Sequence, residues 1–457
     1  MQQAPSLDLE GMDVLVLGLG MSGRSAARFC AERGARVTAA DENEASQLAD
    51  AGELDDLGPA VRVLCGQPFP DPSSFALTVP SPGIPVERYR DAAQRVWGDI
   101  ELAGRALSIP IIAVTGTNGK STTVRLIEAM LNAAGLRAEA AGNVGTPALS
   151  LTGKPLDAAV LEVSSFQLEA VESFRPRVAV VLNITPDHLD RHGDLAGYAR
   201  AKRRILENQQ GDDVAVLDFE NELVREFADH APGEIIPFSA RGPRPAVGSS
   251  RASWLDAGAA VFSSGQGIDR VSLDSAQGLP AADRDNALAA LTAVWALGVE
   301  PLEAATALLD FRALPHRYEV ISTAKDVTWL NDSKATNPGA AQRALESTTG
   351  PIIWIAGGRG KGLSFTDLAE TARGRVRRAL LIGEAAEEIE AALAGRVECE
   401  RLEDLETAVA SAASLCQPGD AVLLAPACAS FDQFKSFEER GDRFRSAVLR
   451  RMDKNET

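Results

Sequence analysis

The stretch "AVTGTNGKSTTV" at residues 113–124 decides the fold of the middle of this chain, because it joins a strand to a helix through a glycine-bearing turn. Lys120, Ser121 and Thr122 open the helix. Backbone N–H groups of such a turn can face a phosphate, and the helix dipole favours the negative charge. Lys120 adds a point charge for the β- and γ-phosphates, and the Ser121 or Thr122 hydroxyl can reach Mg²⁺. The stretch therefore predicts an ATP-binding loop, with Val114 standing where the standard motif has its first glycine.

A second glycine turn lies upstream, in "VLVLGLGMSGRSAARF" at residues 14–29. Gly18, Gly20 and Gly23 have the spacing of a dinucleotide-binding turn between a strand and a helix. Asp41 follows the next strand, where an acid can hold a ribose hydroxyl. The motif predicts a site for a nucleoside diphosphate. Taken alone, it does not distinguish NAD or FAD from another ligand.

Three blocks of alternating strand and helix patterns run along the chain, whose 457 residues exceed one ordinary core. We expect an α/β fold with a Rossmann-like domain at 1–105, a P-loop ATPase-like parallel sheet at 106–312, and a second Rossmann-like domain at 313–457. The stretch "ARGPRPAVGSSRASWL" at 240–255 is rich in Pro, Gly and Ser, which indicates a loop or an insertion.

Composition narrows the class of protein. The formal net charge is −18, so the surface repels nucleic acid and anionic lipid, and neither is an expected partner. Five scattered cysteines form no CxxC pair, which fits a reducing compartment. The N-terminus lacks the features of a signal peptide, and no run of about eighteen apolar residues could span a membrane. We therefore expect a cytoplasmic protein.

Acidic and histidine side chains follow buried strands near the expected ATP loop. Glu162 ends the apolar run of "DAAVLEVSSFQLE", and Asp187 and His188 follow the run that begins "VAVVLNITP". An acid at such a place is costly unless it is paired or bound to a cation. Parallel strands end at one sheet edge, so Glu162 and His188 are expected with the Ser121 hydroxyl around Mg²⁺. A lone histidine after a strand is more often a structural hydrogen-bonding residue, but the conjunction with the ATP loop favours the metal site for His188.

The helix pattern "YARAKRRILENQ" at 198–209 carries the basic residues Lys202, Arg203 and Arg204. This run could form a solvated face or point at an anionic centre, and the pattern alone favours neither. His192 and His230 have no comparable neighbours in the sequence, so we expect both at the surface.

The motifs together resemble one family. They are "TGTNGKSTT", "LEVSSFQLE", "NITPDHLDRHG", "YARAKRRI", "LPHRYE", "NDSKATNP" and "LLAPACASFDQFKSFEERG". In this order they are similar to the Mur ligases of bacterial peptidoglycan synthesis. The last two motifs most resemble the member that joins D-glutamate to UDP-N-acetylmuramoyl-L-alanine. The resemblance implies that ATP phosphorylates the substrate carboxylate and that the D-glutamate amine attacks the acyl phosphate. It also implies a monomer.

The resemblance assigns roles to particular residues. Those matched to ATP binding are Gly116, Thr117, Asn118, Gly119, Lys120, Ser121, Thr122, Asn286, Arg317 and Asp332. Those matched to catalysis or metal binding are Lys120, Ser121, Glu162, His188 and Lys202. Those matched to the UDP-sugar are Met21, Ser22, Asp41, Ser81 and Asn143, and those on the D-glutamate side are Lys334, Thr336, Lys361, Ser430 and Phe437. Lys202 matches a carbamylated lysine, a modification that converts the cation into an anion able to hold a second Mg²⁺.

The sequence departs from the family pattern in two places. Ala282 and Asp283 replace the usual His-Asn pair before Asn286, and Asn43 stands where an arginine commonly follows Asp41. Three other readings of the chain are a related ligase for a different amino acid, including the folylpolyglutamate type, a nicotinamide-dependent oxidoreductase, and a nucleotide-dependent switch. The dedicated first domain disfavours the folate type, and the ATP loop disfavours the oxidoreductase. The acid, histidine and lysine expected around the phosphates disfavour the switch.

Overall fold

The computed structural model describes residues 7–48, 54, 57–242, 244–245, 249–274, 279–280, 283–360 and 362–455, without the side chains of 453–455. The chain forms two compact units. Unit 1 comprises residues 1–184, 191–276 and 285–309, and unit 2 comprises 185–190, 277–284 and 310–457. Among the described residues, no helix combines the length and the apolar character that a membrane crossing requires.

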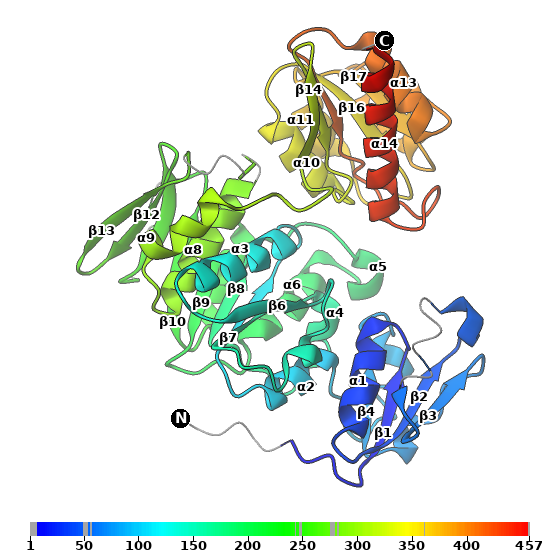
Figure 1. Ribbon diagram of the computed structural model, residues 1–457, viewed down its shortest axis with the longest axis vertical. Coiled ribbons are helices and arrows are strands. Elements are labelled where there is room, and N and C mark those ends of the chain that lie inside the picture. The colour runs from blue at the N-terminus through cyan, green and yellow to red at the C-terminus, as the bar shows by residue number, and fades with distance from the viewer. Residues whose placement is uncertain are drawn as a thin grey trace. The chain divides into compact units, whose positions relative to one another are not determined.

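Unit 1 begins with a small parallel sheet in the order β3-β2-β1-β4. Its strands are β1 (Asp13–Leu17), β2 (Arg36–Asp41), β3 (Val61–Cys65) and β4 (Leu77–Pro80). The 18–23 turn joins β1 to α1 (Met21–Ala31), as the sequence predicts. All four residues of β4 are buried, as are Val14, Leu15, Val16 and Leu17 of β1, so both strands lie within the core. Helix α2 (Asp99–Ala106) follows this sheet in the chain (Figure 1).

The second sheet of unit 1 has the order β13-β12-β11-β10-β9-β8-β5-β7-β6. The strands from β6 to β11 pair in parallel. These parallel strands are β5 (Ile111–Thr115), β6 (Ala138–Gly142), β7 (Ala158–Glu162), β8 (Val178–Val181), β9 (Val214–Asp218), β10 (Glu234–Ser239) and β11 (Ala252–Asp256). The helices of this part are α3 (Lys120–Ala133), α4 (Ser165–Leu168), α5 (Leu189–His192), α6 (Leu195–Arg203), α7 (Glu222–Arg225), α8 (Arg284–Ala296) and α9 (Pro301–Ala304). Strands β5 and β7 are buried throughout, which explains why all their residues except the last are apolar.

The far edge of this sheet corrects the expectation for residues 240–255. The stretch is not wholly a loop, because residues 252–255 belong to β11, which pairs in parallel with β10. Strands β12 (Ala259–Ser264) and β13 (Gly267–Ser272) then extend the sheet in antiparallel fashion. Residues 243 and 246–248 of the stretch lie outside the described residues. The Pro and Gly content correctly indicated a turn, but the strand that follows the turn was not predicted.

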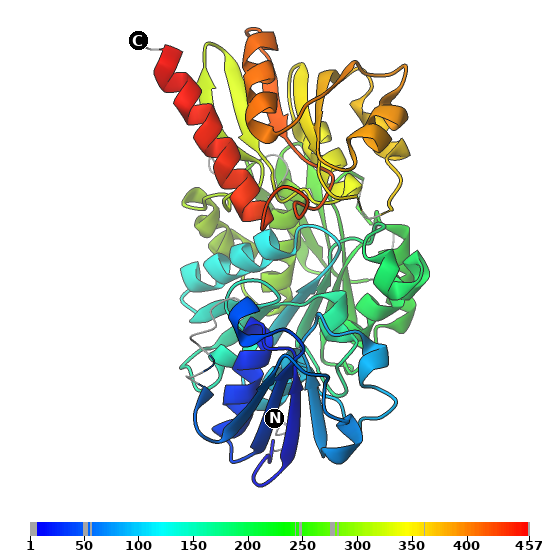
Figure 2. The same ribbon diagram turned by 90° about the vertical axis from the view of Figure 1, so that its right-hand side faces the viewer.

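Unit 2 contains a six-stranded sheet in the order β14-β15-β19-β16-β17-β18. Its strands are β14 (Glu319–Ala324), β15 (Val327–Asn331), β16 (Ile352–Gly357), β17 (Val376–Ile382), β18 (Cys399–Arg401) and β19 (Ala421–Leu424). Its helices are α10 (Pro338–Ser347), α11 (Thr366–Ala372), α12 (Ala386–Leu393), α13 (Leu405–Leu415) and α14 (Phe437–Asn455). The long helix α14, red in Figure 2, packs against α13 and β14. Parallel pairing from β15 to β18 confirms the doubly wound α/β character.

Strand β14 was not predicted from the sequence. It pairs antiparallel with β15 through a two-residue turn at Lys325 and Asp326, whose φ angles are +51° and +61°. Two positive φ values suit the twist of a tight hairpin, yet such turns are usually recognised by glycine or asparagine. The sequence therefore carried no obvious turn signal at this position.

Candidate functional site

The shape of the 116–121 turn depends on its glycines and on hydrogen bonds to Asn183, the second residue after strand β8. Gly116 has φ +155° and Gly119, which caps α3, has φ +89°. Thr117 N donates to Asn183 O at 2.8 Å, and Asn118 N donates to Asn183 Oδ1 at 2.9 Å. Asn183 follows β8 and was not singled out from the sequence. Its signal is a polar side chain directly after a buried apolar strand, which marks the binding edge of a parallel sheet.

Asn286 lies against this turn. It belongs to α8 and is buried, and a Cβ at Gly119 would collide with its Oδ1 atom. The structure therefore brings a residue matched to ATP binding next to the loop that was matched to the same ligand. Thr122 is buried in α3. Ala282 lies outside the described residues.

Two lysines converge on the first carbonyl of the turn. Lys120 Nζ donates to Gly116 O at 2.9 Å and to Thr117 O at 3.0 Å. Lys202 Nζ donates to the same Gly116 O at 2.8 Å, and its ammonium lies 4.6 Å from the centre of the Tyr198 ring. Lys202 is 1% exposed, so its amine sits in the interior beside the phosphate loop. This placement separates Lys202 from an ordinary solvated lysine.

Glu162 brings a carboxylate to the same place. It ends β7, is 3% exposed, and its Oε2 accepts a hydrogen bond from Ser121 Oγ at 2.6 Å. Asn143 Nδ2 donates to Glu162 Oε1 at 3.0 Å, so the carboxylate joins the phosphate loop to a residue matched to the UDP-sugar. A carboxylate and a hydroxyl beside a phosphate loop are the hard oxygen donors that Mg²⁺ prefers. Ser121 and Glu162 therefore fit the metal that the resemblance implies.

The three basic residues Lys202, Arg203 and Arg204 lie in different environments. Arg203 is partly exposed and bonds His230, while Arg204 donates to three main-chain carbonyls, those of Leu168, Glu169 and Val171, at 2.6–2.8 Å. Only the first member of the run lies at the phosphate loop. The sequence pattern favoured neither a solvated face nor an anionic centre. In the structure, Lys202 lies at the phosphate loop, whereas Arg203 and Arg204 bond other parts of the chain.

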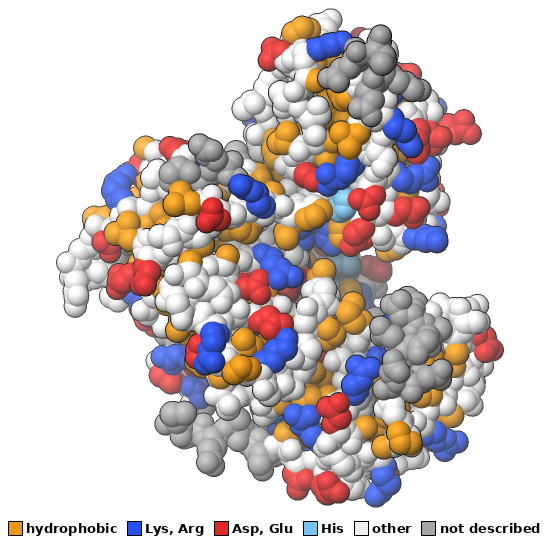
Figure 3. All heavy atoms as spheres, viewed as in Figure 1, with side chains coloured by type: hydrophobic (Ala, Val, Ile, Leu, Met, Phe, Trp, Pro, Cys, Tyr) orange, Lys and Arg blue, Asp and Glu red, His pale blue; other side chains and the backbone are white. Residues whose placement is uncertain are grey.

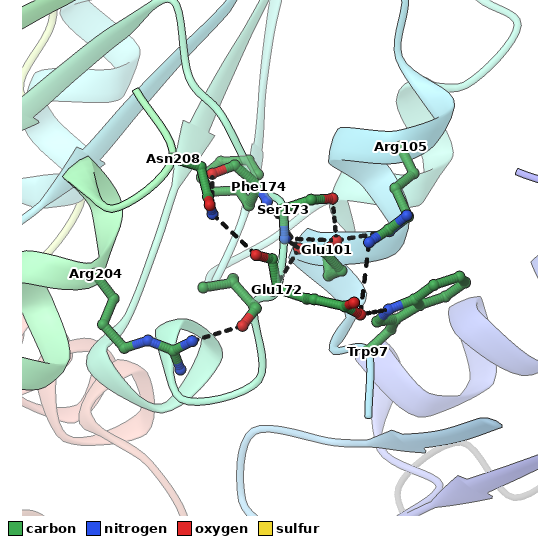
Figure 4. Close-up of polar contacts among 9 residues, drawn as sticks. Trp97, Glu101, Arg105, Glu172, Ser173, Phe174, Arg204 and Asn208 are labelled. Atoms are coloured by element: carbon green, nitrogen blue, oxygen red, sulfur yellow. Dashed lines mark hydrogen bonds and ion pairs between the residues drawn. The ribbon is translucent and has the colours of Figure 1, made fainter. Parts of the chain in front are cut away.

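The loop after α4 that Arg204 holds is fixed from its other side by α2 (Figure 4). Glu101 is fully buried and accepts N–H bonds at 2.9–3.0 Å from Glu172, Ser173 and Phe174, together with the Ser173 hydroxyl at 2.6 Å. Arg105 pairs with it at 2.6 Å. A buried carboxylate needs this degree of satisfaction. Glu101 was not predicted from the sequence, since its main-chain partners lie 71 to 73 residues away.

His192 corrects the expectation that it lies at the surface. Its side chain is 4% exposed. Nε2 lies 3.0 Å from Ser165 Oγ, and the ring stacks on Phe166 with 5.5 Å between centroids and lies 5.2 Å from the Tyr198 ring. His192 therefore packs beside Tyr198, whose ring also contacts the Lys202 ammonium. His230 is exposed, as expected.

The 18–23 turn separates the roles of its glycines. Gly18 has φ +83°, and its carbonyl accepts Ser81 Oγ at 2.8 Å. A Cβ at Gly23 would collide with Gly18 O, so this glycine permits close packing of α1 on β1. A Cβ at Gly20 would meet no atom within 4 Å. Gly20 therefore leaves its side of the turn open.

Asp41 holds this turn by its side chain. Oδ2 accepts the Leu19 N–H at 2.7 Å, and Oδ1 accepts the Asn43 N–H at 2.9 Å and Asn43 Nδ2 at 3.0 Å. The residue that replaces the family's arginine thus supports the acid. Met21 is exposed at the start of α1, whereas Ser22 bonds the buried Asp99. Burial raises the pKa of Asp99, which also accepts Gln167 Nε2 at 2.9 Å.

His188 belongs to unit 2. It has φ +53°, which is uncommon for a residue with a side chain, and its N–H donates to Asp187 Oδ1 at 3.0 Å. Asn337 Nδ2 donates to Asp187 Oδ2 at 3.1 Å, so this segment is bonded to the loop that begins α10. The expected approach of His188 to Glu162, which belongs to unit 1, stays a prediction.

Unit 2 gathers residues matched to ATP at the carboxyl end of β15. Asp332 N donates to Leu424 O, and Asp332 Oδ1 accepts the Tyr318 N–H at 3.2 Å. Burial raises the pKa of Asp332 to about 7, opposed by the Tyr318 N–H and by the Arg317 charge and reinforced by Asp283. Arg317 and Asp332 therefore lie within electrostatic reach of each other. Asp283, a departure from the family pattern, adds a second acid there.

The residues matched to D-glutamate follow in the same and neighbouring loops. Lys334 Nζ lies 3.6 Å from the centre of the Phe437 ring. Thr336 N donates to Lys334 O at 2.8 Å, and Ser430 is 2% exposed in the loop after β19. Lys361 lies outside the described residues. The structure brings Lys334 and Phe437 together from segments about a hundred residues apart.

These features define a nucleotide-binding α/β enzyme with a glycine-lysine phosphate loop. The family described as "Mur ligase middle domain" matches residues 114–294, and "Mur ligase, glutamate ligase domain" matches 316–428. The chain belongs to the Mur ligase family. It is 42% identical over 454 residues to the UDP-N-acetylmuramoylalanine–D-glutamate ligase of Anaeromyxobacter dehalogenans, covering 96% of this chain and 97% of that protein. A protein of the same name from Pelotomaculum thermopropionicum is 41% identical, with 97% and 98% covered.

Solved structures agree in fold. A MurF ligase from Thermotoga maritima in complex with ADP superposes with a TM-score of 0.61 at 19% identity, covering 99% of this chain and 97% of that one. A pseudomurein peptide ligase type C from Methanothermus fervidus gives a TM-score of 0.61 at 16% identity, with 97% and 100% covered. At this identity the likeness concerns the fold alone. The expectation of a Mur ligase α/β fold is confirmed.

Proposed function

We propose that this chain is an ATP-dependent ligase that joins D-glutamate to UDP-N-acetylmuramoyl-L-alanine in the synthesis of peptidoglycan precursors. The names of the relatives that match nearly the whole chain support the reaction. The observation that carries the chemistry is the meeting of Lys120, Lys202, Ser121 and Glu162 at one phosphate loop. A nicotinamide-dependent oxidoreductase would need none of these four.

The reaction has two steps. An oxygen of the alanine carboxylate attacks the γ-phosphorus of ATP, and ADP leaves. The amine of D-glutamate then attacks the acyl carbon, and phosphate leaves with the carboxylate oxygen. Phosphoryl transfer of this kind depends mainly on positioning and charge neutralisation. Lys120 and the N–H groups of the turn would hold the phosphates, and Mg²⁺ bound by Ser121 and Glu162 would supply the remaining positive charge.

Each substrate has a separate part of the chain in this proposal. Residues 1–105 bind the UDP-sugar, 106–312 bind ATP, and 313–457 contribute to ATP and D-glutamate binding. Gly20 offers an open backbone position for the diphosphate, and Asn143 links that substrate to Glu162. Asn286, Arg317 and Asp332 serve ATP. Lys334, Thr336, Lys361, Ser430 and Phe437 serve D-glutamate, and His188 serves the reacting centre. We further propose a monomer that works in the cytoplasm.

Lys202 is proposed to be carbamylated and to hold a second Mg²⁺. Its support is burial beside Gly116 O, where an added carbamate would bring an anion to the phosphate loop. Lys202→Ala should lose most activity and regain part of it with a short carboxylic acid. The control is Arg203→Ala, a change in the next side chain, which bonds His230 instead. Full activity of Lys202→Ala without added acid would refute the modification.

The test of the function is phosphate release with ATP, Mg²⁺, UDP-N-acetylmuramoyl-L-alanine and a panel of amino acids. D-glutamate alone should give rapid release. Release with another amino acid but not with D-glutamate would identify a related ligase. No release that depends on both the UDP-sugar and an amino acid would overturn the proposal.

A further inference from the structure

Arg440 is a fully buried cation in the first turn of α14. Its guanidinium donates from Nε to Ser333 Oγ at 3.0 Å, from Nη2 to Ser333 O at 2.8 Å, and from Nη1 to Cys428 O at 3.2 Å. All three acceptors are uncharged. A buried guanidinium whose hydrogen bonds go to neutral oxygens is costly, and burial lowers the pKa of Arg440 to about 10, opposed by Cys428 and by the Asp432 charge. A hydrophobic side chain could fill the same space at lower cost.

The three segments that Arg440 joins carry the residues matched to D-glutamate. Ser333 directly precedes Lys334, Cys428 lies two residues before Ser430, and Arg440 itself lies three residues after Phe437. These segments are otherwise far apart in the chain, since the bond from Arg440 to Ser333 spans 107 residues. One guanidinium thus fixes the backbone beside three proposed ligand side chains.

Two further contacts tie the same segments together. Ser333 Oγ donates to Phe437 O at 2.8 Å while accepting from Arg440 Nε. Lys334 Nζ lies 3.6 Å from the Phe437 ring centre. Because Phe437 is held through both its carbonyl and its ring, a shift of Ser333 would be transmitted to Lys334 and to Phe437 together. The loop after β16 is also bonded to the segment between Cys428 and Ser430, since Arg359 N donates to Ala429 O at 2.8 Å.

We propose that Arg440 is a positioning residue for D-glutamate: it sets the spacing of Lys334, Ser430 and Phe437 without contacting the amino acid itself. The proposal rests on the proposed function, because it takes D-glutamate as the substrate of this edge. Hydrogen bonds in a rigid fork fix direction as well as distance, which a lysine cannot reproduce. Misplacement of positioning groups by about 1 Å can cost about 100-fold in rate.

The test uses the full-length enzyme and steady-state phosphate release. The variants are Arg440→Met, Arg440→Lys and the milder Ser333→Ala, which removes one acceptor of Arg440 and the bond to Phe437. Arg443→Gln is the matched control, because Arg443 lies on the same helix and pairs with Glu406 at 2.7 Å. The KM for D-glutamate and the KM for UDP-N-acetylmuramoyl-L-alanine are measured for each protein. Unaltered enzyme is measured first, so that failure of the function itself is recognised separately.

We expect Arg440→Met to raise the KM for D-glutamate at least about 10-fold, with roughly unchanged KM for the UDP-sugar. Ser333→Ala should shift it less, in the same direction, and Arg440→Lys should fall between the parent and Arg440→Met. If Arg440→Met is insoluble, the other two variants decide. An unchanged KM for D-glutamate would overturn the proposal. So would a loss confined to kcat, or an equal rise in both KM values, because either would indicate a merely structural role.

Discussion

The 18–23 turn and the 116–121 turn both follow a buried parallel strand and both open a helix, yet their surroundings differ. The first is braced by Asp41, which accepts the Leu19 N–H, and leaves Gly20 open. The second is surrounded by Lys120, Lys202 and Glu162. A diphosphate that is only held needs an open backbone, whereas a phosphoryl group that is transferred needs cations and metal ligands. Glycine spacing therefore describes the approach of the backbone, and the neighbouring side chains describe the chemistry.

The largest effect should come from removing the cation of the second turn. Lys120→Met is expected to lower kcat by about 10²–10³-fold, since one group that stabilises transferring charge is lost. The KM for the UDP-sugar should stay roughly unchanged, because that substrate is proposed to bind at the first turn. Phosphate release at saturating substrates measures kcat, and a titration with the UDP-sugar measures its KM. Lys154→Met is the control, since Lys154 is exposed and pairs with Glu139. Equal losses in the two variants would contradict a specific role of Lys120, and a raised KM for the UDP-sugar in Lys120→Met would contradict the contrast between the turns.

Glu162→Gln should act through the metal. The change preserves size but removes the charge beside Ser121, so the Mg²⁺ concentration for half-maximal activity should rise about 10–100-fold. A titration of activity with Mg²⁺ checks this shift. Glu139→Gln, on the neighbouring strand β6, is the control. A change in maximal rate with no shift in the Mg²⁺ titration would contradict the assignment of Glu162 as a metal ligand.

Within the first turn, alanine substitutions of Gly23 and Gly20 should affect different properties: protein stability in the first case and substrate binding in the second. Gly23→Ala is expected to lower the free energy of unfolding by about 1–3 kcal/mol, because the new Cβ collides with Gly18 O. Gly20→Ala has space for its Cβ and a φ of −66°, so the protein should fold as the parent does.

The KM for the UDP-sugar should nevertheless rise about tenfold in Gly20→Ala, since the methyl group occupies the ligand's side of the turn. Urea denaturation and KM measurements separate the two effects. If Gly20→Ala left the KM unchanged, the first turn would not be the diphosphate site.

The smallest effect concerns pH. The pKa of Asp332 is raised from its ordinary 3.8 to about 7 by burial, so the folded state disfavours the charged carboxylate. Stability should therefore fall as pH rises from about 4 to about 7 and remain reduced above that. Asp332→Asn should be more stable than the parent at pH 8 and closer to it at pH 4. Urea midpoints at both pH values test this, with the exposed Asp367→Asn as control. A parallel pH profile of parent and Asp332→Asn would contradict it.

The features predicted correctly from the sequence are the buried strands, which follow from local periodicity, and the glycine turns, which follow from loop composition. Strands β5 and β7 are apolar up to their last residue, and the glycine turns follow from the spacing of their glycines. The sequence could not predict β14, whose hairpin turn is Lys325-Asp326, or the burial of His192. Glu101 and Arg440 were missed for one shared reason. Partners of Glu101 lie 71 residues away and partners of Arg440 lie 107 residues away, and a charged residue in a helix ordinarily indicates a solvated face.

The central claim is that the two turns bring one substrate's carboxylate and the other's phosphate into a single reaction. Its most direct measurement uses UDP-N-acetylmuramoyl-L-alanine labelled with ¹⁸O in the alanine carboxylate, turned over with ATP and D-glutamate. Mass spectrometry of the released phosphate should find one ¹⁸O atom in each phosphate molecule, because the carboxylate oxygen leaves with it. Unlabelled phosphate accompanied by amide product would show that no acyl phosphate forms, and would contradict the account.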